Sequence, residues 1–421
     1  MDILVIGGGG REHAIIRKLK ESPRCGKIYC TPGNGGISCD AECFGIAATD
    51  AQGIVDLAKR LQVDFAVVAP DDPLVAGVVD RLEEAGIPAF GPNARAAIIE
   101  GSKVFSKDLM KKYGIPTADY EVFDDAAQVL AYIRQKDQYP VVIKAEGLAL
   151  GKGVLICENQ EQAEEAVHSI MEDKIFGASG NRVVVEEFLT GPEVSVLAFT
   201  DSKTMVPMVS SKDHKRVFDG NKGPNTGGMG TVSPNPYYSE QMAQQCMETI
   251  FLPTMAAMNA EGRPFKGCLY FGLMLTPKGP KVIEYNCRFG DPETQVVLPR
   301  LRTDLLEIFL AVREERLDQL NIEWLDGACA CVILASGGYP GKYAKGLTIN
   351  GLNKDGQVAS ATVYHAGTAC KGDDFVTAGG RVLGVTACAA TLDEALDRAY
   401  AACKGISFEG MQYRTDIGRI E

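Results

Sequence analysis

Residues 282–295 read VIEYNCRFGDPETQ, an apolar strand pattern that ends in a turn crowded with charge. Side chains alternate along a strand, so we expect Glu284 and Asn286 to share one face. Tyr285 and Cys287 should share the other. A carboxylate beside an amide oxygen suits Mg²⁺, which usually takes its other ligands from substrate phosphates. An ordinary surface turn also needs polarity, but not opposed charges this dense beside a metal-competent pair. The stretch therefore predicts a functional site.

The composition narrows the class of protein. The 421 residues are enough for about two to four domains, and 46% of them are hydrophobic, so large cores can form. The net charge of −12 argues against non-specific nucleic-acid binding, because no basic excess exists to displace counterions. Anionic small-molecule substrates remain compatible with this charge, because they need only a local cluster of Lys and Arg.

The cysteines and the apolar runs indicate the compartment. The thirteen cysteines include no CxxC pair, and many lie in apolar runs, so reduced structural thiols are favoured over a zinc site. No signal peptide is recognisable, and no apolar run approaches the roughly 18 residues of a membrane span. We therefore expect a cytoplasmic protein with no membrane and no nucleic-acid partner.

The first hundred residues alternate short apolar runs with amphipathic stretches, which predicts a parallel sheet covered by helices on both faces. The expected strands are 2–6, 27–30, 65–68 and 88–90, and the expected helices are 12–21, 51–61 and 74–85.

The rest of the chain mixes longer strands and helices. The expected helices are 103–113, 160–172, 239–260, 303–314 and 392–404. The expected strands are 140–144, 153–157, 182–187, 193–200, 268–275, 280–286, 328–334, 357–364 and 381–388. Residues 205–232 should be a strand followed by a long Gly-rich loop.

The segment GGGGREHA (residues 7–14) follows the first strand and opens the first helix. Glycines let the backbone approach an anion, and a helix N-terminus supplies N–H groups. A dinucleotide site needs G-x-G-x-x-G, but Glu12 stands at the third glycine position, and no acidic residue ends the second strand. A phosphate or small-substrate site is favoured over NAD, while a tight turn without any ligand remains an alternative.

Three more segments have the composition of binding loops. KAEGLALGKGV (144–154) combines glycines with lysines that suit nucleotide phosphates, although it lacks the P-loop pattern. VVVEEFL (183–189) is a strand that ends in acids, where backbone groups could read an adenine edge; a strand that meets solvent often ends this way too. DHKR (213–216) and GPNTGGMG (223–230) form one long polar loop, and such loops usually have a function. His214 in this loop is expected to be structural or a hydrogen-bonding group rather than a base.

Together these motifs resemble the ATP-grasp superfamily and, within it, the phosphoribosylamine–glycine ligase family. The resemblance runs nearly end to end, and GPNTGGMG and NCRFGDPETQ are specific to this family. The segments that carry it are GGGGREHA (7–14), PGNGG (32–36), PLVAG (73–77), EGSK (100–103), GLA (147–149), GKGV (151–154), DHKR (213–216), GPNTGGMG (223–230), NCRFGDPETQ (286–295), GGYPG (337–341) and GRVLGVT (380–386).

The resemblance implies a fold and a reaction. The fold is a multidomain α/β and α+β chain: an N-terminal parallel-sheet (pre-ATP-grasp) domain at 1–102, an ATP-grasp domain at 103–325 with a mobile lid at about 118–192, and a β-rich cap domain at 326–421. The reaction joins glycine to 5-phosphoribosylamine with ATP, through a glycyl phosphate, in de novo purine synthesis. The implied cofactor is Mg²⁺ or Mn²⁺, and the expected state is a monomer.

The resemblance also implies site residues. Glu284 and Asn286 would ligate the metal. Arg288 and Asp213 would be catalytic. The residues implied to bind ATP are Lys103, Lys144, Gly147, Gly151, Lys152, Gly153, Glu186, Glu187, Leu189 and Glu193. Those implied to face the other substrates are Gly9, Gly10, Arg11, Asn225, Thr226, Gly227, Gly228, Asp291, Pro292 and Glu293.

Three alternatives differ from this interpretation. Another ATP-grasp ligase, such as a carboxylation enzyme, is disfavoured by the GPNTGGMG loop. An NAD-linked oxidoreductase is disfavoured by Glu12 and the missing ribose acid. A catalytically inactive binding module is disfavoured because both expected metal ligands and both lysines, Lys103 and Lys144, are present.

Overall fold

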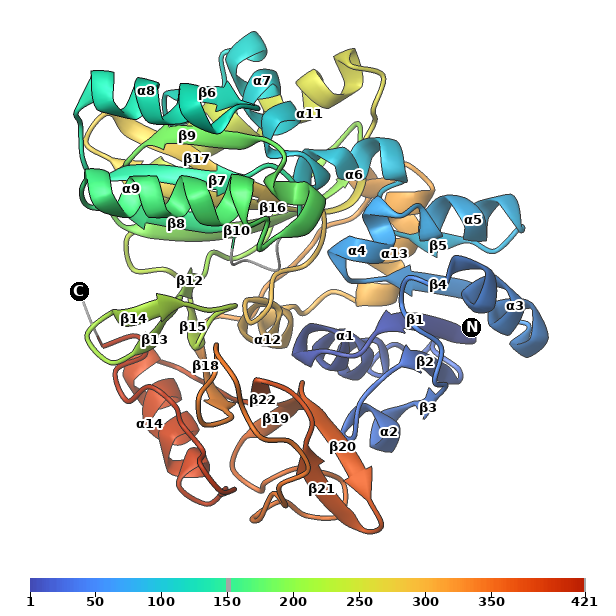
Figure 1. The fold of residues 1–421 in the computed structure, drawn as a ribbon. Coiled ribbons are helices and arrows are strands. Elements are labelled where there is room, and N and C mark those ends of the chain that lie inside the picture. Colours follow the sequence, from blue (N-terminus) through green and yellow to red (C-terminus); the bar gives the residue numbers. More distant parts are fainter. Residues whose placement is uncertain (149–152, 420–421) are drawn as a thin grey trace.

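The structure is a computed structural model that describes residues 1–148 and 153–419. Figure 1 shows an N-terminal sheet with its helices, a central region built on two sheets, and a C-terminal sheet with one long helix. The expected class, a multidomain chain with an N-terminal parallel sheet and a strand-rich C-terminal part, is confirmed.

The N-terminal sheet is parallel throughout, in the order β3-β2-β1-β4-β5. Its central strands are apolar and fully buried because helices cover both faces. One predicted helix, 74–85, is two helices separated at Gly77, whose φ of +82° breaks the helical path. The elements are β1 (Ile3–Gly7), α1 (Gly10–Leu19), β2 (Ile28–Pro32), α2 (Ile37–Asp40), β3 (Glu42–Cys43), α3 (Ala51–Leu61), β4 (Phe65–Val68), α4 (Asp71–Val75), α5 (Val78–Glu84) and β5 (Ala89–Phe90).

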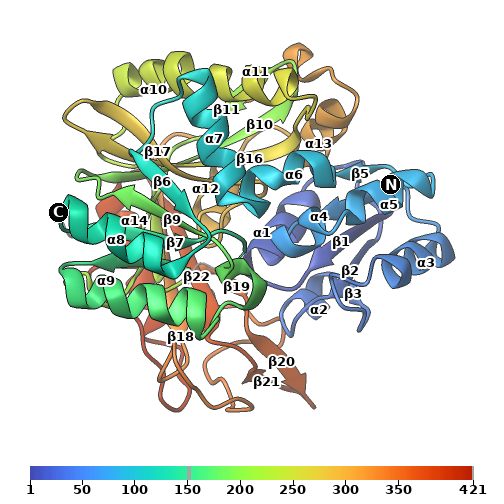
Figure 2. The same ribbon diagram turned by 45° about the horizontal axis from the view of Figure 1, so that its top comes forward.

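Two helices lead into a second sheet, of order β6-β9-β7-β8, in which all neighbours are antiparallel. Figures 1 and 2 show α8 and α9 side by side on the outer face of this sheet. The elements are α6 (Ala94–Gly101), α7 (Lys103–Tyr113), β6 (Tyr120–Phe123), α8 (Ala126–Lys136), β7 (Val141–Ala145), β8 (Val154–Cys157), α9 (Gln160–Val167), the π-helix His168–Glu172, the 3₁₀ turn Gly177–Gly180 and β9 (Val183–Glu187).

The third sheet, of order β11-β10-β16-β17, forms the body of the central region, and β17 at its edge carries Glu284 and Asn286. The predicted helix 239–260 is continuous but contains one π-helical turn, Met247–Phe251. The elements are β10 (Glu193–Asp201), β11 (Met205–Pro207), α10 (Glu240–Cys246), α11 (Leu252–Ala260), β16 (Lys266–Thr276), β17 (Gly279–Asn286), α12 (Thr294–Val297), α13 (Leu305–Arg313) and the 3₁₀ turns Leu298–Arg300 and Leu317–Gln319.

The C-terminal sheet, of order β12-β15-β18-β22-β19, takes two strands from the polar loop region of the centre. It therefore joins strands from both sides of residue 326, and α14 packs on it (Figure 1). The elements are β12 (Lys212–Asp213), β13 (Arg216–Phe218), β14 (Lys222–Asn225), β15 (Gly230–Ser233), β18 (Ala328–Ala335), β19 (Thr362–His365), β20 (Thr368–Lys371), β21 (Asp374–Thr377), β22 (Arg381–Ala389) and α14 (Leu392–Cys403).

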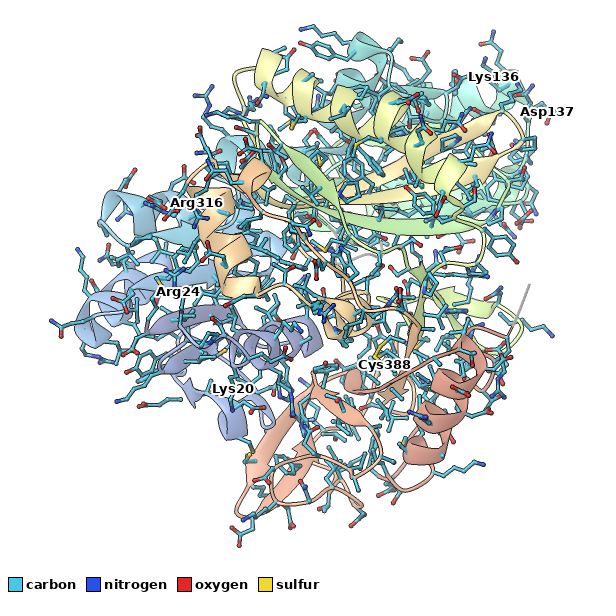
Figure 3. All side chains as sticks on the ribbon, turned by 180° about the vertical axis from the view of Figure 1, so that it is seen from behind. Lys20, Arg24, Lys136, Asp137, Arg316 and Cys388 are labelled. Atoms are coloured by element: carbon cyan, nitrogen blue, oxygen red, sulfur yellow. A yellow bond between two sulfur atoms is a disulfide. The ribbon has the colours of Figure 1, made fainter. Side chains whose placement is uncertain are left out.

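One pair of cysteines differs from the expectation of reduced thiols. Cys329 and Cys388 lie directly opposite each other on β18 and β22, with Cα atoms 4.1 Å apart, and they form a disulfide. Figure 3 labels Cys388 within this sheet. The sequence did not indicate the pair because 59 residues separate its two members. No helix in the described part of the chain is long and apolar enough to cross a membrane.

Candidate active site

A cavity of about 1030 Å³ opens between the β6-β9-β7-β8 sheet, the edge of the body sheet and the polar loops that lead to the C-terminal sheet. Most of the predicted site residues line it. They are Arg11, Lys103, Lys144, Gly153, Glu186, Glu187, Leu189, Glu193, Asp213, Asn225, Thr226, Gly227, Glu284, Asn286, Arg288, Asp291 and Glu293. Gly9, Gly10, Gly147, Gly228 and Pro292 lie beside lining residues, as described below. Gly151 and Lys152 fall outside the described residues.

The strand β17 presents the two expected metal ligands to this cavity. Glu284 and Asn286 line the cavity with half-buried side chains. Tyr285 also contributes to the lining, but Tyr285 and Cys287 are buried residues. The Tyr285 hydroxyl contacts Thr254 Oγ1 at 2.9 Å, which fixes the buried face of the strand. The alternation predicted from the sequence is confirmed, and it leaves two oxygen ligands on one wall of the cavity.

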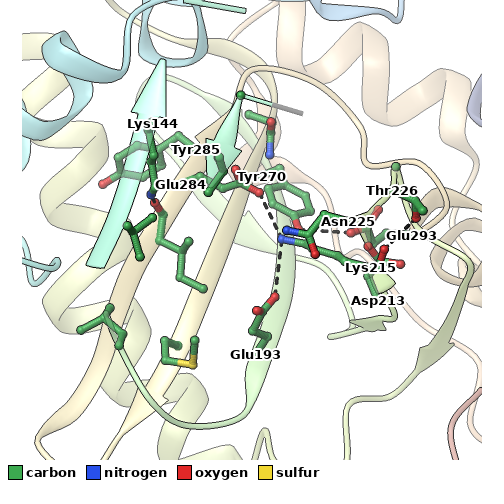
Figure 4. Close-up of a pocket in the computed structure, with 18 of the residues that line it drawn as sticks. Lys144, Glu193, Asp213, Lys215, Asn225, Thr226, Tyr270, Glu284, Tyr285 and Glu293 are labelled. Atoms are coloured by element: carbon green, nitrogen blue, oxygen red, sulfur yellow. Dashed lines mark hydrogen bonds and ion pairs between the residues drawn. The ribbon is translucent and has the colours of Figure 1, made fainter. Parts of the chain in front are cut away.

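Positive charge surrounds Glu284. Lys215 Nζ lies 3.5 Å from a Glu284 oxygen and 3.5 Å from a Glu193 oxygen, so one lysine bridges two carboxylates (Figure 4). Burial raises the pKa of Glu284, but Lys215, Lys144 and Lys103 outweigh this effect and the net pKa is lowered. Glu284 therefore stays ionised at neutral pH, as a metal ligand must.

Arg288 follows the strand and ties its end to the N-terminal region. Its Nη2 lies 3.2 Å from Glu100 Oε1 and donates to Asn286 Oδ1 at 3.2 Å. Glu100 also accepts a hydrogen bond from the Cys287 backbone N–H at 2.7 Å. The Arg288 Nε is buried and has no hydrogen-bond partner among the described residues. A buried guanidinium N–H without a partner points to an acceptor that arrives with a ligand.

A second charged cluster lies on the side of the cavity formed by the β6-β9-β7-β8 sheet. Lys144 Nζ and Lys107 Nζ lie 2.9 Å and 2.8 Å from the two oxygens of Glu186. Lys107 also donates to Thr117 Oγ1 at 2.8 Å, and Thr117 donates to the Val282 carbonyl of β17 at 2.7 Å. Burial lowers the pKa of Lys107 to about 8. The two lysines and one carboxylate carry an excess of positive charge, and the Thr117 contact links them to the strand of Glu284.

Lys103 lies at the start of α7 beside the Gly-rich loop. Its Nζ donates to the Gly147 carbonyl at 2.8 Å, and burial lowers its pKa. At the other end of the loop, the Ala145 N–H donates to the Gly153 carbonyl at 2.8 Å. The two ends of the loop that the structure describes are therefore held beside Lys103 and the end of β7.

The N-terminal glycine loop meets the charged turn after β17. Arg11 Nη1 donates to the Phe289 carbonyl at 3.2 Å. A Cβ on Gly9 would lie 3.3 Å from Asp291 Oδ2, and a Cβ on Gly10 would lie 2.6 Å from Gln295 Nε2. The glycines therefore lie against the side-chain ends of Asp291 and Gln295, and the loop and the turn form one surface.

Asp213 and Glu293 face each other across the same surface. Burial and the charge of Glu293 raise the pKa of Asp213 well above its usual range. Glu293 accepts hydrogen bonds from Ser195 Oγ at 3.2 Å and Tyr270 Oη at 3.1 Å. His214 is structural, as expected: Nδ1 contacts the Gly230 carbonyl at 3.0 Å, and Nε2 accepts from the Gly418 N–H at 3.0 Å.

Sequence reasoning did not single out three cavity residues, Lys107, Lys215 and Arg381. Arg381 reaches in from the C-terminal sheet, where it donates to the Gly227 and Asp291 carbonyls at 2.5 and 2.7 Å and pairs with the Asp291 carboxylate at 3.3 Å. Lys215 belongs to the DHKR motif and Arg381 to the GRVLGVT motif. These motifs were the sequence signal that could have identified both residues. Nothing local marked Lys107.

Substituting Gly228 by alanine should destabilise this surface. Gly228 has a φ of +112°, and a Cβ there would lie 2.4 Å from Pro292 Cδ and 2.6 Å from Asp213 Oδ1. We expect Gly228→Ala to lower the free energy of unfolding by about 3 kcal/mol, measured by urea titration. Gly220→Ala is the matched control, because its φ is +70° but its nearest neighbour is the end of Lys222 at 3.7 Å. Equal losses in both variants would mean that backbone strain, not the close approach, decides the effect.

The fold and the cavity with its lysine cluster belong to an ATP-grasp protein, the class that the family match shows. Residues 101–294 match the ATP-grasp (A) domain of phosphoribosylglycinamide synthetase, residues 1–100 its N domain and residues 329–420 its C domain. The chain belongs to the phosphoribosylglycinamide synthetase family.

Several relatives span the whole chain. A phosphoribosylamine–glycine ligase of Caldanaerobacter subterraneus subsp. tengcongensis is 48% identical over 417 residues, with 99% of both chains covered. One of Escherichia coli strain K12 is 46% identical, with 99% of this chain and 98% of that one covered. The crystal structure of a Thermotoga maritima phosphoribosylamine–glycine ligase is 33% identical, with a TM-score of 0.86 over 99% of this chain and 100% of that one.

A more distant structure shares the fold alone. The biotin carboxylase domain of Hydrogenobacter thermophilus 2-oxoglutarate carboxylase has a TM-score of 0.75 over 98% of this chain and 91% of that one, at 18% identity. These matches confirm the expected fold and the expected enzyme class, an ATP-dependent ligase.

Proposed function

We propose that this protein joins glycine to 5-phosphoribosylamine, with ATP cleaved to ADP and phosphate, in purine biosynthesis. The observation that carries the proposal is the single cavity in which the lysine cluster, the Glu284–Asn286 wall and the glycine loop meet. The glycine carboxylate attacks the γ-phosphate to give a glycyl phosphate, and the amine then displaces phosphate. The glycine carboxylate and the ATP phosphates are both anionic, so the protein's main task is to neutralise and position them.

The nucleotide binds between the two central sheets. Lys103 and Lys144 neutralise its phosphates, and the loop that contains Gly147, Gly151, Lys152 and Gly153 closes over them. The end of β9 at Glu186, Glu187 and Leu189 frames adenine, and Glu193 holds the ribose. Support comes from the buried cluster at the floor of this space, where Lys144 and Lys107 share the Glu186 carboxylate.

The residues present fit a divalent metal. Glu284 and Asn286 offer a carboxylate and an amide oxygen, which Mg²⁺ accepts alongside phosphate oxygens and water. In the described residues no group of three His, Cys, Asp or Glu side chains could hold a metal alone, which agrees with a site completed by the nucleotide. When bound, Mg²⁺ or Mn²⁺ would neutralise charge on the transferred phosphoryl group.

The other substrates occupy the surface where the glycine loop meets the charged turn. Gly9, Gly10 and Arg11 hold an anionic group of phosphoribosylamine through backbone N–H groups and the guanidinium. The loop residues Asn225, Thr226, Gly227 and Gly228 and the turn residues Asp291, Pro292 and Glu293 enclose glycine and the amine.

Arg288 and Asp213 act on the reacting groups. Arg288 directs its unpartnered Nε to an oxygen of the acyl phosphate, where negative charge develops. Asp213, whose pKa burial raises well above its usual range, takes up the proton that the attacking amine releases.

The chain is proposed to work as three units, 1–102, 103–325 and 326–421, with 118–192 as a lid. The separate apolar core of the lid, which includes Val129, Ile143 and Val185, supports movement of that part as a body. The proposed oligomeric state is a monomer.

Omitting one substrate at a time tests the reaction. Purified protein with ATP, Mg²⁺, glycine and phosphoribosylamine should release ADP and form a product with the mass of glycinamide ribonucleotide. Omission of glycine or of phosphoribosylamine should reduce ADP release to background. ADP release that ignores glycine would contradict the proposal, and stimulation by bicarbonate in place of glycine would favour a carboxylation enzyme instead.

Lys107 should position Glu186 rather than touch the reacting atoms. We expect Lys107→Met to raise KM for ATP about tenfold, the loss of roughly 1.4 kcal/mol of binding, with kcat little changed. Lys111→Met is the matched control: Lys111 is exposed on the same helix, and both ammonium groups lie near the Tyr120 ring, at 5.5 and 5.7 Å. An unchanged KM in Lys107→Met, or the same rise in both variants, would refute the positioning role.

A further inference from the structure

Two exposed cysteines lie together at the contact between the N-terminal and C-terminal regions. Among the free cysteines of the described residues, only Cys39 and Cys370 are exposed. Cys39 belongs to α2 and Cys370 to β20, so they are distant in sequence. Neither belongs to the cavity described above.

Both sulfur atoms lie near one backbone oxygen. Cys370 Sγ is 3.4 Å and Cys39 Sγ is 3.9 Å from the Gly35 carbonyl oxygen. The two sulfurs are therefore less than about 7.5 Å apart, and each side chain can change its position by rotation about χ1.

The backbone around the pair is held in place. The Gly35 N–H donates to the Thr368 carbonyl at 3.1 Å, and a Cβ on Gly35 would lie 2.9 Å from the carbonyl carbon of Ala369. Asn34 donates to the Gly8 carbonyl at 2.9 Å and to the His365 carbonyl at 2.8 Å. The two segments thus meet repeatedly beside the glycine loop, and the cysteines stay close in the folded protein.

The surroundings of the two thiols differ. Cys370 Sγ lies 3.6 Å from Ser38 Oγ, and the Ser38 hydroxyl itself donates to the Gly35 carbonyl at 2.7 Å. Burial and the neighbouring Cys370 raise the pKa of Cys39.

We propose that Cys39 and Cys370 form a reversible disulfide when the protein meets a peroxide, which links the N-terminal and C-terminal regions. The Cys370 thiolate attacks a peroxide oxygen, the O–O bond breaks, and a sulfenic acid and hydroxide form; the hydroxide takes up the proton that Cys370 lost on ionising, which gives water. Cys39 sulfur then attacks the sulfenic sulfur and displaces hydroxide, which takes the Cys39 proton to give a second water. Two thiols lose two electrons, and one peroxide gains them. A dithiol reductant reverses the bond by exchange.

Peptide mapping of the full chain tests the proposal. The reduced protein is treated with hydrogen peroxide, blocked with N-ethylmaleimide and cleaved by trypsin without reductant. Residues 355–371 form a tryptic peptide in which Cys370 is the only cysteine, and residues 28–59 form one with Cys30, Cys39 and Cys43. We expect these two peptides to be linked, and dithiothreitol to separate them. The bond closes a loop that spans most of the chain, so the oxidised protein should also unfold at a higher temperature.

Three variants identify the partner. Cys39→Ser and Cys370→Ser should each abolish the linked peptide and the rise in unfolding temperature. Cys43→Ser, in the same peptide as Cys39, should keep both. Loss of the link in Cys43→Ser, or separate oxidation of Cys39 and Cys370 without a link in the unsubstituted protein, would overturn the proposal.

Discussion

Replacing Glu284 by glutamine should lower kcat about 1000-fold, which corresponds to roughly 4 kcal/mol of transition-state stabilisation. Glutamine keeps the shape of the side chain but removes the charge that a metal needs. Glu284 contributes the only carboxylate of the proposed metal pair, because its partner is the amide Asn286. The reaction brings a carboxylate to a polyphosphate, so the loss of metal affects the chemical step and not binding alone.

The fold should tolerate this change. Glu284 is partly exposed at the cavity wall, and its contact with Lys215 is long, at 3.5 Å. We therefore expect the free energy of unfolding to change by less than about 1 kcal/mol. Glu323→Gln is a suitable control, because it also removes an exposed carboxylate with a long ion pair, 3.7 Å to Arg302, but lies outside the cavity.

The dependence of activity on Mg²⁺ concentration distinguishes a metal ligand from a carboxylate that only lies near the metal. ADP release by the unsubstituted protein should stop in EDTA and return with added Mg²⁺. Glu284→Asp should retain part of the activity and need a higher Mg²⁺ concentration, whereas Glu284→Gln should stay inactive at every concentration. Near-normal turnover of Glu284→Gln would remove Glu284 from the metal site.

Local sequence patterns predicted much of the fold because the residues within a helix or strand largely determine where it forms. The helices at 51–61 and 103–113 and the strand at 65–68 have the predicted bounds. The face of β17 that carries Glu284 followed from alternation alone. By contrast, the sequence analysis did not predict β6 and α8. β6 is a short strand that is only partly buried. The joining of β12 and β15 to the C-terminal sheet depends on pairing with distant strands, which no local pattern encodes.

The site was predicted where one segment holds the chemistry and was incomplete where distant segments meet. Residues 284–293 are contiguous, so their motif was visible. Lys107 reaches Glu186, and Arg381 reaches Asp291, only because the folded chain brings them together. A lysine on an amphipathic helix and an arginine at the start of a strand look ordinary in sequence. Their importance comes from burial and partners, which are properties of the tertiary structure.

Replacing Arg288 by methionine should abolish activity and also destabilise the protein. Arg288 and Glu100 form a largely buried pair, with side chains 18% and 7% exposed and 3.2 Å between Nη2 and Oε1. Removing one partner of such a pair leaves a buried charge uncompensated, at a cost of about 3 kcal/mol in unfolding free energy. The proposed contact with the acyl phosphate is lost as well, so kcat should fall about 1000-fold.

The stability loss should depend on pH. Burial already raises the pKa of Glu100 above its usual 4.5, and Arg288 opposes that rise. Without Arg288 the pKa rises further, so the folded protein holds the proton more tightly than the unfolded chain. Stability of Arg288→Met should therefore be best preserved near pH 4.5 and should fall as the pH rises toward the raised pKa. Urea titrations at several pH values measure this slope.

A second substitution separates the structural from the chemical role of Arg288. In Glu100→Gln/Arg288→Met the buried carboxylate is gone, and the glutamine oxygen can still accept the Cys287 N–H. We expect this double variant to regain most of the lost stability and to lose the pH slope, because no buried charge is left unpaired. Activity should stay about 1000-fold low, since nothing replaces the guanidinium at the acyl phosphate. Recovery of activity together with stability would show that Arg288 only holds Glu100 in place.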